Sequence, residues 1–490
     1  MNPKGLPITA TPASPYAVQE HHEFLAASRE ALASASLQLA LNRLGETLAA
    51  GNRTAFEQLP GSSLLRDQAR AIKDEMLAHL DGYLVQLEQT IEQRGGHVHW
   101  AADGEEAVQI VERIARESGV RRIVKSKSMV TEEIHLNRHL EAAGLEVTET
   151  DFGEFIIQVA GERPSHIVGP ALHKTAEEMA DVLNRRFHTH LTSDPAEMAR
   201  FARGHLRQKF AEAQMGITGG NFLVAETGTV VIISNEGNAR LTSSVPRVLC
   251  SIVGIEKVIP RLADLPVFLK VLARAATGQK MSIYTSLITG PRRVGEQDGP
   301  EEFHLVLLDN GRSKILGSPM RESLFCIRCG ACLNICPVYR KVGGHAYGGT
   351  YSGPIGAVLT PLFDGLNENA HQPQASSLCG ACQSVCPVKI QIPELLVRNR
   401  AALHEQHLAP WGEEFIYRVW SRLMRSPRAY RWLTWVASRT LPRFARQGWL
   451  RRLPGPLAGW TECRDFPAPA PRSFHELWRE NPKVGSPSSS

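Results

Sequence analysis

Apolar and polar positions in the first part of the chain recur with the period of helices. Residues 18–94 therefore predict helices, which Gly51 and the Pro60-Gly61 turn are expected to divide. Glycine weakens a helix interior, and proline cannot donate to the helical hydrogen-bond ladder. An all-helical N-terminal region is expected.

From His97 onward, short apolar runs alternate with amphipathic segments. The predicted strands are 97–101, 122–124 and 145–149, and the predicted helices between them are 105–117 and 131–143. This alternation indicates an α/β layer with a mainly parallel sheet. Farther on, residues 221–238 predict two strands around a Glu-Thr-Gly turn, and residues 392–404 predict a helix.

Length and composition allow more than one domain. The chain has 490 residues, 43% hydrophobic and 21% charged, which is enough for two or more cored domains. No apolar run approaches the length of a membrane span, and residues 1–16 lack the apolar segment of a secretory signal. We therefore expect a cytoplasmic protein with reduced thiols. Cys250 is expected to be a buried core residue, and Cys463 is the other cysteine outside any motif.

Seven of the nine cysteines lie in two nearly identical blocks. The first reads Cys326-Ile-Arg-Cys329-Gly-Ala-Cys332-Leu-Asn-Ile-Cys336-Pro, and the second reads Ser376-Ser-Leu-Cys379-Gly-Ala-Cys382-Gln-Ser-Val-Cys386-Pro. The run C-x2-C-x2-C-x3-C-P is the ligand pattern of a cubane [4Fe-4S] cluster. Two runs predict two clusters, an arrangement typical of single-electron transfer.

The fourth cysteine of each run serves the other cluster in two-cluster ferredoxins. One cluster is therefore assigned Cys326, Cys329, Cys332 and Cys386, and the second is assigned Cys336, Cys379 and Cys382. Zinc usually takes two separated C-x2-C pairs and fits seven crowded cysteines poorly. A disulfide framework fits a long chain without a secretion signal even less well.

The second cluster has three evident thiolates, because Ser376 stands where Cys326 stands in the first block. It is either a three-iron [3Fe-4S] cluster or a cubane whose fourth iron is held by water, Ser376, a nearby carboxylate or His371. The forty-two residues between Cys336 and Cys379 are too many for the compact bacterial ferredoxin hairpins. Helices are expected to fill this gap, as in the α-helical ferredoxin modules of succinate dehydrogenase iron–sulfur subunits.

Two stretches before the cysteines are candidates for binding a small anion. Lys125-Ser126-Lys127-Ser128 lies between a predicted strand and a predicted helix, where backbone N–H groups and two ammonium groups favour a carboxylate or phosphate. Alternatively, the serines cap the helix and the lysines are solvated. The second stretch is Glu226-Thr227-Gly228. Alternatively, this stretch is only the turn that connects two strands of a hairpin.

Other polar residues near strand ends are expected to be structural when each is taken singly; they are Asp151, Glu154, Gln158 and His173. The chain contains no dinucleotide-binding fingerprint and no P-loop, so neither a nicotinamide nor a nucleoside triphosphate is indicated.

The C-terminal region is basic and rich in tryptophan. Residues 401–490 contain 14 Lys/Arg against 7 Asp/Glu and seven of the eight tryptophans. Apolar and arginine positions between Phe415 and Arg425 recur at helical spacing on different faces. A packed helical subdomain competes with docking onto a partner subunit or a membrane surface. Nucleic-acid binding is disfavoured because no recognised module accompanies the charge. Residues 485–490 are expected to be disordered.

Taken together, these stretches resemble the lactate utilization protein B family over almost the whole chain. The resemblance rests on Val124–Glu133, on the Glu226-Thr227-Gly228-Thr229 turn, on both cysteine blocks including the missing eighth cysteine, and on two stretches between the blocks, Gly343–Gly348 and Tyr351–Gly356. It implies an α/β lactate-utilization domain similar to ribose-5-phosphate isomerase and CoA-transferase folds, followed by an α-helical ferredoxin-like domain. The corresponding boundaries are 1–79 (helical), 80–315 (α/β), 316–400 (ferredoxin-like) and 401–490 (helical C-terminal region).

The resemblance also implies a role in the oxidation of L-lactate to pyruvate, alongside lactate utilization proteins A and C. Two four-iron clusters would relay single electrons toward a partner and the quinone pool. On this hypothesis Lys125 and Lys127, with Ser126, Ser128 and Thr227, bind a small 2-hydroxy acid, and Glu226 orients or deprotonates its hydroxyl group. The alternatives are an autonomous hydroxy-acid dehydrogenase or dehydratase that uses an open cluster iron, and a protein whose clusters are only structural.

Overall fold

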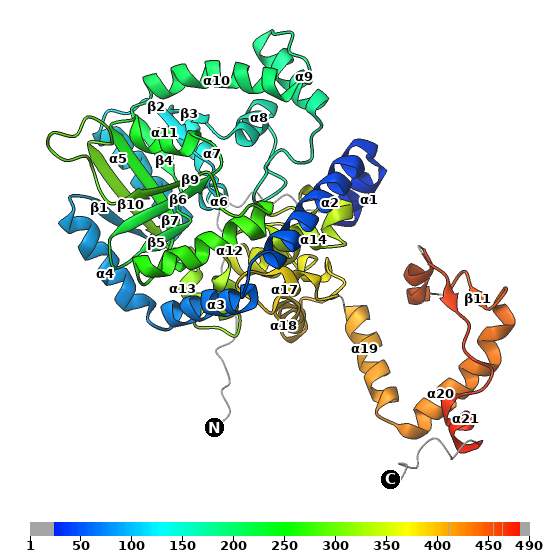
Figure 1. Ribbon diagram of the computed structural model, residues 1–490. Helices are drawn as coiled ribbons and strands as arrows, with labels where there is room; N and C mark the ends of the chain where they lie inside the picture. The colour runs from blue at the N-terminus through cyan, green and yellow to red at the C-terminus, as the bar shows by residue number, and fades with distance from the viewer. Residues whose placement is uncertain (1–23, 410, 454, 463, 481–490) are drawn as a thin grey trace. The chain divides into compact units, whose positions relative to one another are not determined.

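The computed structural model describes residues 24–480 apart from 410, 454 and 463, and Figure 1 labels its elements. Cys463 and the last six residues of the chain therefore lie outside the described residues. The chain divides into two compact units, Met1–Gln406 and His407–Ser490. None of the described helices is long and apolar enough to cross a membrane.

An all-parallel sheet of six strands forms the centre of the first unit (Figure 1). In spatial order the strands are β1 (His97–Ala101), β10 (Glu302–Leu308), β7 (Val248–Gly254), β4 (Met215–Thr218), β2 (Arg122–Lys125) and β3 (Glu146–Glu149). The side chains of β7 are all buried, as expected for a central strand of a parallel sheet covered on both faces. The predicted α/β layer with a parallel sheet is confirmed.

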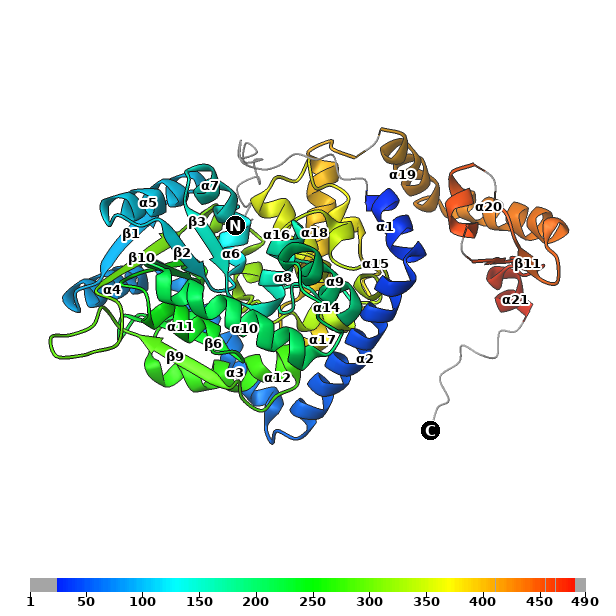
Figure 2. The same cartoon turned by 90° about the horizontal axis from the view of Figure 1, so that it is seen from above.

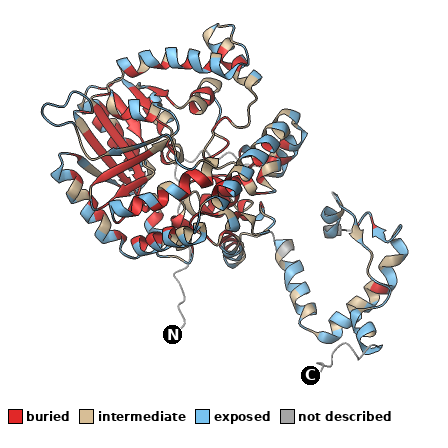
Figure 3. Ribbon diagram, in the orientation of Figure 1, coloured by how far each residue is buried: buried red, intermediate tan, exposed pale blue. Residues whose placement is uncertain are grey.

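Helices cover this sheet because their apolar stripes need a partner surface. The helices around the sheet are α4 (Leu80–Gln93), α5 (Gly104–Glu117), α6 (Met129–Glu133), α7 (Leu136–Ala142), α8 (Phe152–Ala160), α9 (Ala176–Phe187), α10 (Pro195–Glu212), α11 (Asn238–Ser244) and α12 (Leu265–Thr277). Side chains of α5 and α7 share one core with the sheet, whereas those of α4 and α12 belong to a larger core on its other side. Figure 3 shows the buried sheet between partly exposed helices.

A second, four-stranded sheet joins the larger core. Its order is β8 (Val258–Ile259), β5 (Phe222–Val224), β6 (Thr229–Ser234) and β9 (Tyr284–Ile288). The antiparallel pair β5–β6 flanks the Glu-Thr-Gly turn, so the two strands predicted within 221–238 are confirmed.

Two of the predicted helix boundaries are wrong. The helix expected over 131–143 is two helices, α6 and α7, because His135 adopts a left-handed conformation (φ 50°) between them. Gly51 does not interrupt α2 (Ala35–Glu57), although the Pro60-Gly61 turn does separate α2 from α3 (Ser62–Ala78). The Gly51 backbone instead lies against Gly278, the residue that ends α12.

The cysteine blocks lie among short helices, packed against the N-terminal helices α1 (Phe24–Ala33) and α2. The helices of this module are α13 (Arg312–Leu316), α14 (Ala331–Ile335), α15 (Tyr339–Val342), α16 (Gly353–Phe363), α17 (Ala381–Val385) and α18 (Ile392–Glu405). Helices α15 and α16 occupy the long gap between the blocks, and α18 is the helix predicted at 392–404. Figure 2 shows α2 running along α14 and α15.

The second unit has its own elements but little core. They are α19 (Trp411–Met424), α20 (Pro427–Thr440), β11 (Trp449–Leu450), β12 (Phe466–Pro467) and α21 (Phe474–Glu480). Among its described side chains only Ser438, Leu450 and Leu453 are buried, and Figure 3 colours the unit exposed or intermediate almost throughout. The expectation of a packed helical subdomain is therefore not met.

Candidate metal centre and the adjoining sheet edge

The two cysteine blocks share one local structure. Gly330 begins α14 at φ 74° and Gly380 begins α17 at φ 80°, a left-handed conformation that glycine adopts without steric cost. The residue before the second ligand position is also left-handed in both blocks, at Arg328 (φ 58°) and Leu378 (φ 54°). The sequence repeat is thus a repeat of backbone geometry.

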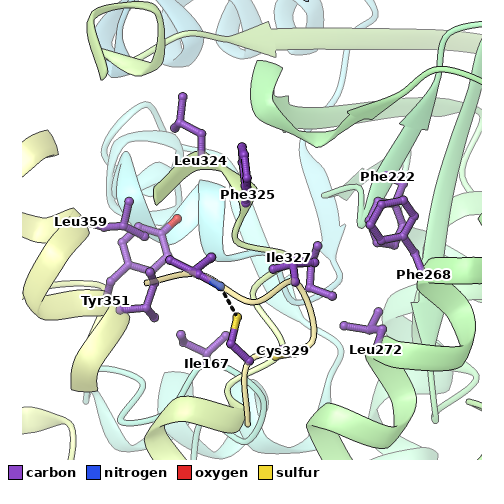
Figure 4. Close-up of a cluster of buried hydrophobic side chains, with 14 of the residues drawn as sticks. Ile167, Phe222, Phe268, Leu272, Leu324, Phe325, Ile327, Cys329, Tyr351 and Leu359 are labelled. Atoms are coloured by element: carbon purple, nitrogen blue, oxygen red, sulfur yellow. Dashed lines mark hydrogen bonds between the residues drawn. The ribbon is translucent and has the colours of Figure 1, made fainter. Parts of the chain in front are cut away.

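Four cysteines line one pocket with about 330 Å³ of empty space, whose other walls include Ile355 and Ile390. These four are Cys326, Cys329, Cys332 and Cys386, the set that the sequence assigned to the first cluster. Burial raises the pKa of the Cys332 thiol well above its usual range, and the neighbouring Cys329 and Cys326 raise it further. Burial also raises the pKa of Cys386 to about 11. Figure 4 shows Cys329 near apolar core side chains, among them Ile167 and Ile327.

The other three cysteines form a neighbouring group. Burial and the adjacent Cys336 raise the pKa of Cys382 to about 12, and Cys379 contributes to the raised pKa of Cys336. Cys379 is exposed, and the backbone N–H of Ala381 lowers its pKa. Because Cys332 lies in α14 and Cys336 directly follows it, the two groups are adjacent.

Both groups fit iron–sulfur clusters. Buried thiols that repel one another ionise only when a cation compensates the thiolate charges, and cluster iron supplies that compensation. Among the described residues, no three His, Cys, Asp or Glu side chains converge on the position of a single metal ion. A cubane spaces its thiolates farther apart, since each one binds a different iron.

Two buried donors beside the cysteines have no acceptor among the described residues: Asn334 Nδ2 and Arg328 Nη1. Asn334 lies between Cys332 and Cys336, and the backbone N–H of Arg328 is 3.4 Å from Cys326 Sγ. Buried donors are rarely left unpaired, so cluster sulfurs are suitable acceptors for both. These unpaired donors are a second feature that fits a cluster.

His166 fixes the orientation of Asn334. Its Nδ1 accepts from the backbone N–H groups of Val168 and Gly169, so the proton sits on Nε2, which donates to Asn334 Oδ1 at 3.1 Å. Burial keeps this imidazole neutral by lowering its pKa to about 3. The amide nitrogen of Asn334 is therefore the end that is free to face a cluster.

A buried ionic network joins the α/β domain to the cysteine module. Arg312, after β10, lies 2.9 Å from Glu133 and 2.5 Å from Glu256, and its side chain is inaccessible to solvent. Tyr351 donates to Glu133 at 2.8 Å, and the guanidinium of Arg328 lies 4.4 Å from the Tyr351 ring centroid. Although burial opposes ionisation, Arg312 and Lys257 hold the pKa of Glu256 at about 2. The first cysteine group is thereby fastened to the carboxyl edge of the sheet.

The Lys-Ser-Lys-Ser stretch lies at the same edge, but its two lysines differ. Lys125 is fully buried, with its ammonium 2.5 Å from Glu149 and 3.2 Å from Glu132. Lys127 Nζ is buried without a partner among the described residues, and burial lowers its pKa. Neither lysine is solvated, which overturns that part of the structural alternative.

The two serines of this stretch hold the backbone in place. Ser128 caps α6 by accepting from the Thr131 N–H, and the Ser126 N–H donates to the Ile217 carbonyl of β4. The capping half of the structural alternative is therefore confirmed. Lys127 is left as the residue of the stretch with a free charged group.

Glu154, on α8, and Lys127 each influence the pKa of the other, although the two side chains form no ion pair among the described residues. Burial and the neighbouring Glu149 raise the pKa of Glu154 to about 8, and Lys127 opposes this shift. Its Oε1 also lacks a partner among the described residues. The other polar residues singled out near it have structural roles: Asp151 caps α8, Gln158 bonds the backbone of Val147 and Glu149, and His173 lies between Ser165 and Glu162.

The Glu226-Thr227-Gly228 turn contacts residues other than Lys125 and Lys127. Glu226 is exposed and accepts from the Leu262 N–H at 2.9 Å, and the Thr227 hydroxyl pairs with Thr229 at 2.7 Å. Gly228 packs against Thr90 and Ile91 of α4. In the contacts of the described residues, Glu226 and Thr227 do not meet Lys125 or Lys127.

The sequence did not reveal the residues that contact the cysteine module although they are far from it along the chain. Arg66, on α3, donates to the Cys386 carbonyl at 2.6 Å across 320 positions. His166, Arg328 and Asn334 were missed as well; only the last two had a signal, their places within the first cysteine block. Cys250, in contrast, is fully buried, and the expectation that it is a core residue is confirmed.

The parallel α/β domain, joined to a module that gathers seven cysteines, defines a two-cluster iron–sulfur protein. Family models match in the same order: the LUD domain at 84–308, the 4Fe-4S dicluster domain at 322–390, and the C-terminal region of lactate utilisation protein B at 398–483. The chain belongs to the lactate utilization protein B family.

Similar relatives are lactate utilization proteins B from two genera. The protein of Geobacillus thermodenitrificans is 48% identical over 86% of this chain and 89% of its own length, and that of Geobacillus kaustophilus is 47% identical over the same shares. The protein of Bacillus velezensis is 46% identical over 88% of this chain and 90% of its own length. A DUF162 family structure from Deinococcus radiodurans is 13% identical and covers 47% of this chain and 98% of its own, with a TM-score of 0.25.

Proposed function

We propose that this chain is a non-autonomous electron-transfer component in the oxidation of L-lactate to pyruvate. The observation that carries the proposal is the placement of the two cysteine groups. The first is buried against the carboxyl edge of the sheet, and the second reaches the surface at Cys379. When bound, the clusters supply one-electron transfer. The placement of the two groups supports an electron-transfer path from the α/β domain through both clusters to a docked partner, and from there to the quinone pool.

We propose that the 2-hydroxy acid binds beside Lys127 and Glu154. Lys127 would hold the carboxylate, and Ser126 and Ser128 would shape the backbone beside it. Lys125 would stabilise this edge of the sheet through its ion pairs with Glu149 and Glu132. Glu154 Oε1 is the better-placed acceptor for the hydroxyl proton, because it lacks a partner and lies near Lys127. The alternative is that Glu226 orients or deprotonates the hydroxyl with Thr227 beside it, which requires their turn to approach the substrate.

Oxidation of the alcohol breaks one O–H and one C–H bond and releases two electrons and two protons. The chain carries no flavin or nicotinamide motif, so we propose that a partner like lactate utilization protein A or C supplies the two-electron acceptor. We further propose the isomerase/CoA-transferase topology for the α/β domain and an α-helical ferredoxin topology for residues 316–400.

We also propose that the second unit contacts an anionic membrane surface from the cytoplasmic side. Its exposed side chains combine arginines with large aromatics, for example Arg418, Arg422, Trp420 and Trp432. The net charge of residues 401–490 is +7, from the 14 basic and 7 acidic residues. Basic residues attract anionic headgroups, and tryptophan favours the interface. A partner subunit is the alternative occupant of this surface.

The test is anaerobic purification, followed by lactate addition with and without the partner proteins, monitored by electron paramagnetic resonance. Reduction of the clusters only in the presence of partners is expected. Reduction by lactate without partners would instead favour an autonomous dehydrogenase. Clusters that stay inert over the physiological potential range would favour a structural role.

A further inference from the structure

We propose that the Ser376 hydroxyl oxygen is the fourth ligand of the second cluster. The inference rests on the two-cluster assignment above and extends it to the position where the second block lacks a cysteine. Each step comes from the described geometry of the two blocks.

The blocks share backbone hydrogen bonds at corresponding residues. In the first, Leu333 and Asn334 donate to the Gly330 carbonyl; in the second, Gln383 and Ser384 donate to the Gly380 carbonyl. The left-handed residues Arg328 and Leu378 correspond as well. The position of Ser376 therefore corresponds to that of Cys326 in folded structure as well as in sequence.

The side chains at the two corresponding positions make the same contact. The Arg328 N–H lies 3.4 Å from Cys326 Sγ, and the Leu378 N–H lies 3.2 Å from Ser376 Oγ. In the first block this contact belongs to a cluster ligand. In the second block the same contact orients the Ser376 oxygen toward the ligand position that corresponds to Cys326 Sγ.

Arg400 holds the Ser376 backbone in this place. Its Nη2 donates to the Ser376 carbonyl at 3.1 Å, and its Nε donates to the Pro373 carbonyl at 2.8 Å. A ligand fixed by its backbone loses little side-chain freedom on binding, because serine has a single rotatable bond to its oxygen.

His371 is the other protein ligand that the sequence suggested by name. Its Nε2 lies 3.3 Å from the Tyr347 carbonyl oxygen, and its ring stacks on Phe24 with 5.8 Å between centroids. Ser377, next to Ser376, hydrogen-bonds Cys379 through its side chain. Both side chains are engaged, whereas Ser376 Oγ accepts a backbone hydrogen bond and keeps a second lone pair.

Ligation exchanges a proton for iron without a redox change. The Ser376 O–H bond breaks, its proton passes to solvent, and an Fe–O bond forms in place of a bound water. Nearby cations lower the pKa of a coordinated hydroxyl or thiol, so the serinate is accessible beside cluster iron. The second cluster would then keep four irons with only three thiolates.

The experiment compares wild type, Ser376→Ala and Ser376→Cys. Ser384→Ala is the control in the same block, because the Ser384 hydroxyl donates to the Ala381 carbonyl at 2.8 Å and contacts no cluster ligand among the described residues. Each protein is purified anaerobically, oxidised mildly, and analysed for iron content and electron paramagnetic resonance. Wild type, S376C and S384A are expected to keep about eight irons, and S376A is expected to fall to about seven with a three-iron cluster signal.

Two results would overturn the serine ligand. One is an S376A protein that keeps its irons as well as wild type, which would indicate water or another ligand. The other is a wild type that itself carries the three-iron signal under the same treatment. Failure of the two-cluster proposal looks different, since all four proteins would then lack iron.

Discussion

At the scale of single residues, the buried polar atoms without partners among the described residues include four beside the candidate sites. Lys127 Nζ and Glu154 Oε1 lie at the sheet edge, and Arg328 Nη1 and Asn334 Nδ2 lie beside the cysteines. Folded proteins pair most buried polar groups, so unpaired ones indicate a missing ligand, water or ion. Their positions agree with a substrate at one site and cluster sulfurs at the other.

Asn334→Leu should lower the reduction potential of the adjacent cluster. An amide donor to sulfur stabilises the reduced, more negative cluster, and leucine of similar volume removes that donor. A difference of roughly 1 kcal/mol corresponds to about 40 mV for one electron. A redox titration followed by electron paramagnetic resonance measures the shift.

Asn399→Leu is the matched control, because Asn399 is also a buried asparagine of the cysteine module. Its Nδ2 already donates to the Val358 carbonyl, so no cluster hydrogen bond is lost. Equal shifts in both variants would contradict the role of Asn334.

Glu154→Gln should abolish lactate-dependent reduction, and the wild-type rate should rise with pH. Burial and Glu149 raise the pKa of Glu154 to about 8, so the proton-accepting carboxylate is mostly absent below pH 8 and present above it. The charged groups that act on this carboxyl group are Glu149, Lys127, Glu132 and Lys125.

The pH profile is measured with the partner proteins present. Glu226→Gln serves as the comparison, and it should retain the wild-type rate and profile. Loss of activity in E226Q with an active E154Q would reverse the assignment of the proton acceptor.

At the scale of elements, the close crossing of α2 and α12 shows how a local signal can mislead. Gly51 was expected to break a helix, yet α2 continues through it and meets Gly278. Asn52 reinforces the contact by donating to the Ala275 carbonyl at 3.2 Å. The close approach depends on Gly278, whose added Cβ would meet the Gly51 backbone, and no pattern along α2 alone records it.

Alanine at the two glycines of this crossing should have opposite effects on stability. In Gly51→Ala the added Cβ lies 3.5 Å from Gly278, an ordinary contact, and helix propensity adds roughly 0.5–1 kcal/mol. In Gly278→Ala the Cβ would lie 2.6 Å from Gly51 backbone at φ 73°, which should cost roughly 1–3 kcal/mol. Thermal unfolding of the cluster-loaded proteins measures the stability of both variants. Equal unfolding midpoints for the two variants would contradict the described crossing of α2 and α12.

At the scale of the whole molecule, each of the two units has its own chemistry. In the first unit the α/β domain, the cysteine module and the N-terminal helices share a single apolar core, and the Arg312 network crosses between them. The second unit buries few side chains among those described and exposes its arginines and tryptophans. This exposure is the observation that motivates the membrane proposal.

Replacement of Arg418, Arg422 and Arg425 by glutamine in the full chain should weaken binding to phosphatidylglycerol-containing vesicles. Each arginine near an anionic surface contributes about 1 kcal/mol, so the triple variant should bind roughly a hundredfold more weakly. Arg203→Gln with Arg207→Gln, on the exposed face of α10, is the control. Vesicle co-sedimentation measures the effect. If the wild type binds neutral vesicles as well as phosphatidylglycerol-containing vesicles, a partner subunit is favoured instead.

Local patterns alone were sufficient for much of this protein. The cysteine spacing indicated two clusters, and the apolar pattern located β1, β2, β3 and the pair β5–β6 with several helices, because these features depend on residues a few positions apart. The pattern did not locate the central strands β4, β7 and β10. Ser376 could also be recognised as the odd position of the second block. What such patterns cannot contain is which distant residues meet.

Tertiary structure alone placed Arg66 on the Cys386 carbonyl, His166 on Asn334, and Arg312 between Glu133 and Glu256. It also distinguished Lys125, neutralised by two carboxylates, from Lys127, which has no partner among the described residues. These contacts arise when the sheet edge and the cysteine module are buried against each other. Burial then makes each pairing energetically necessary, so the folded chain rather than its local pattern decided which polar groups are free for chemistry.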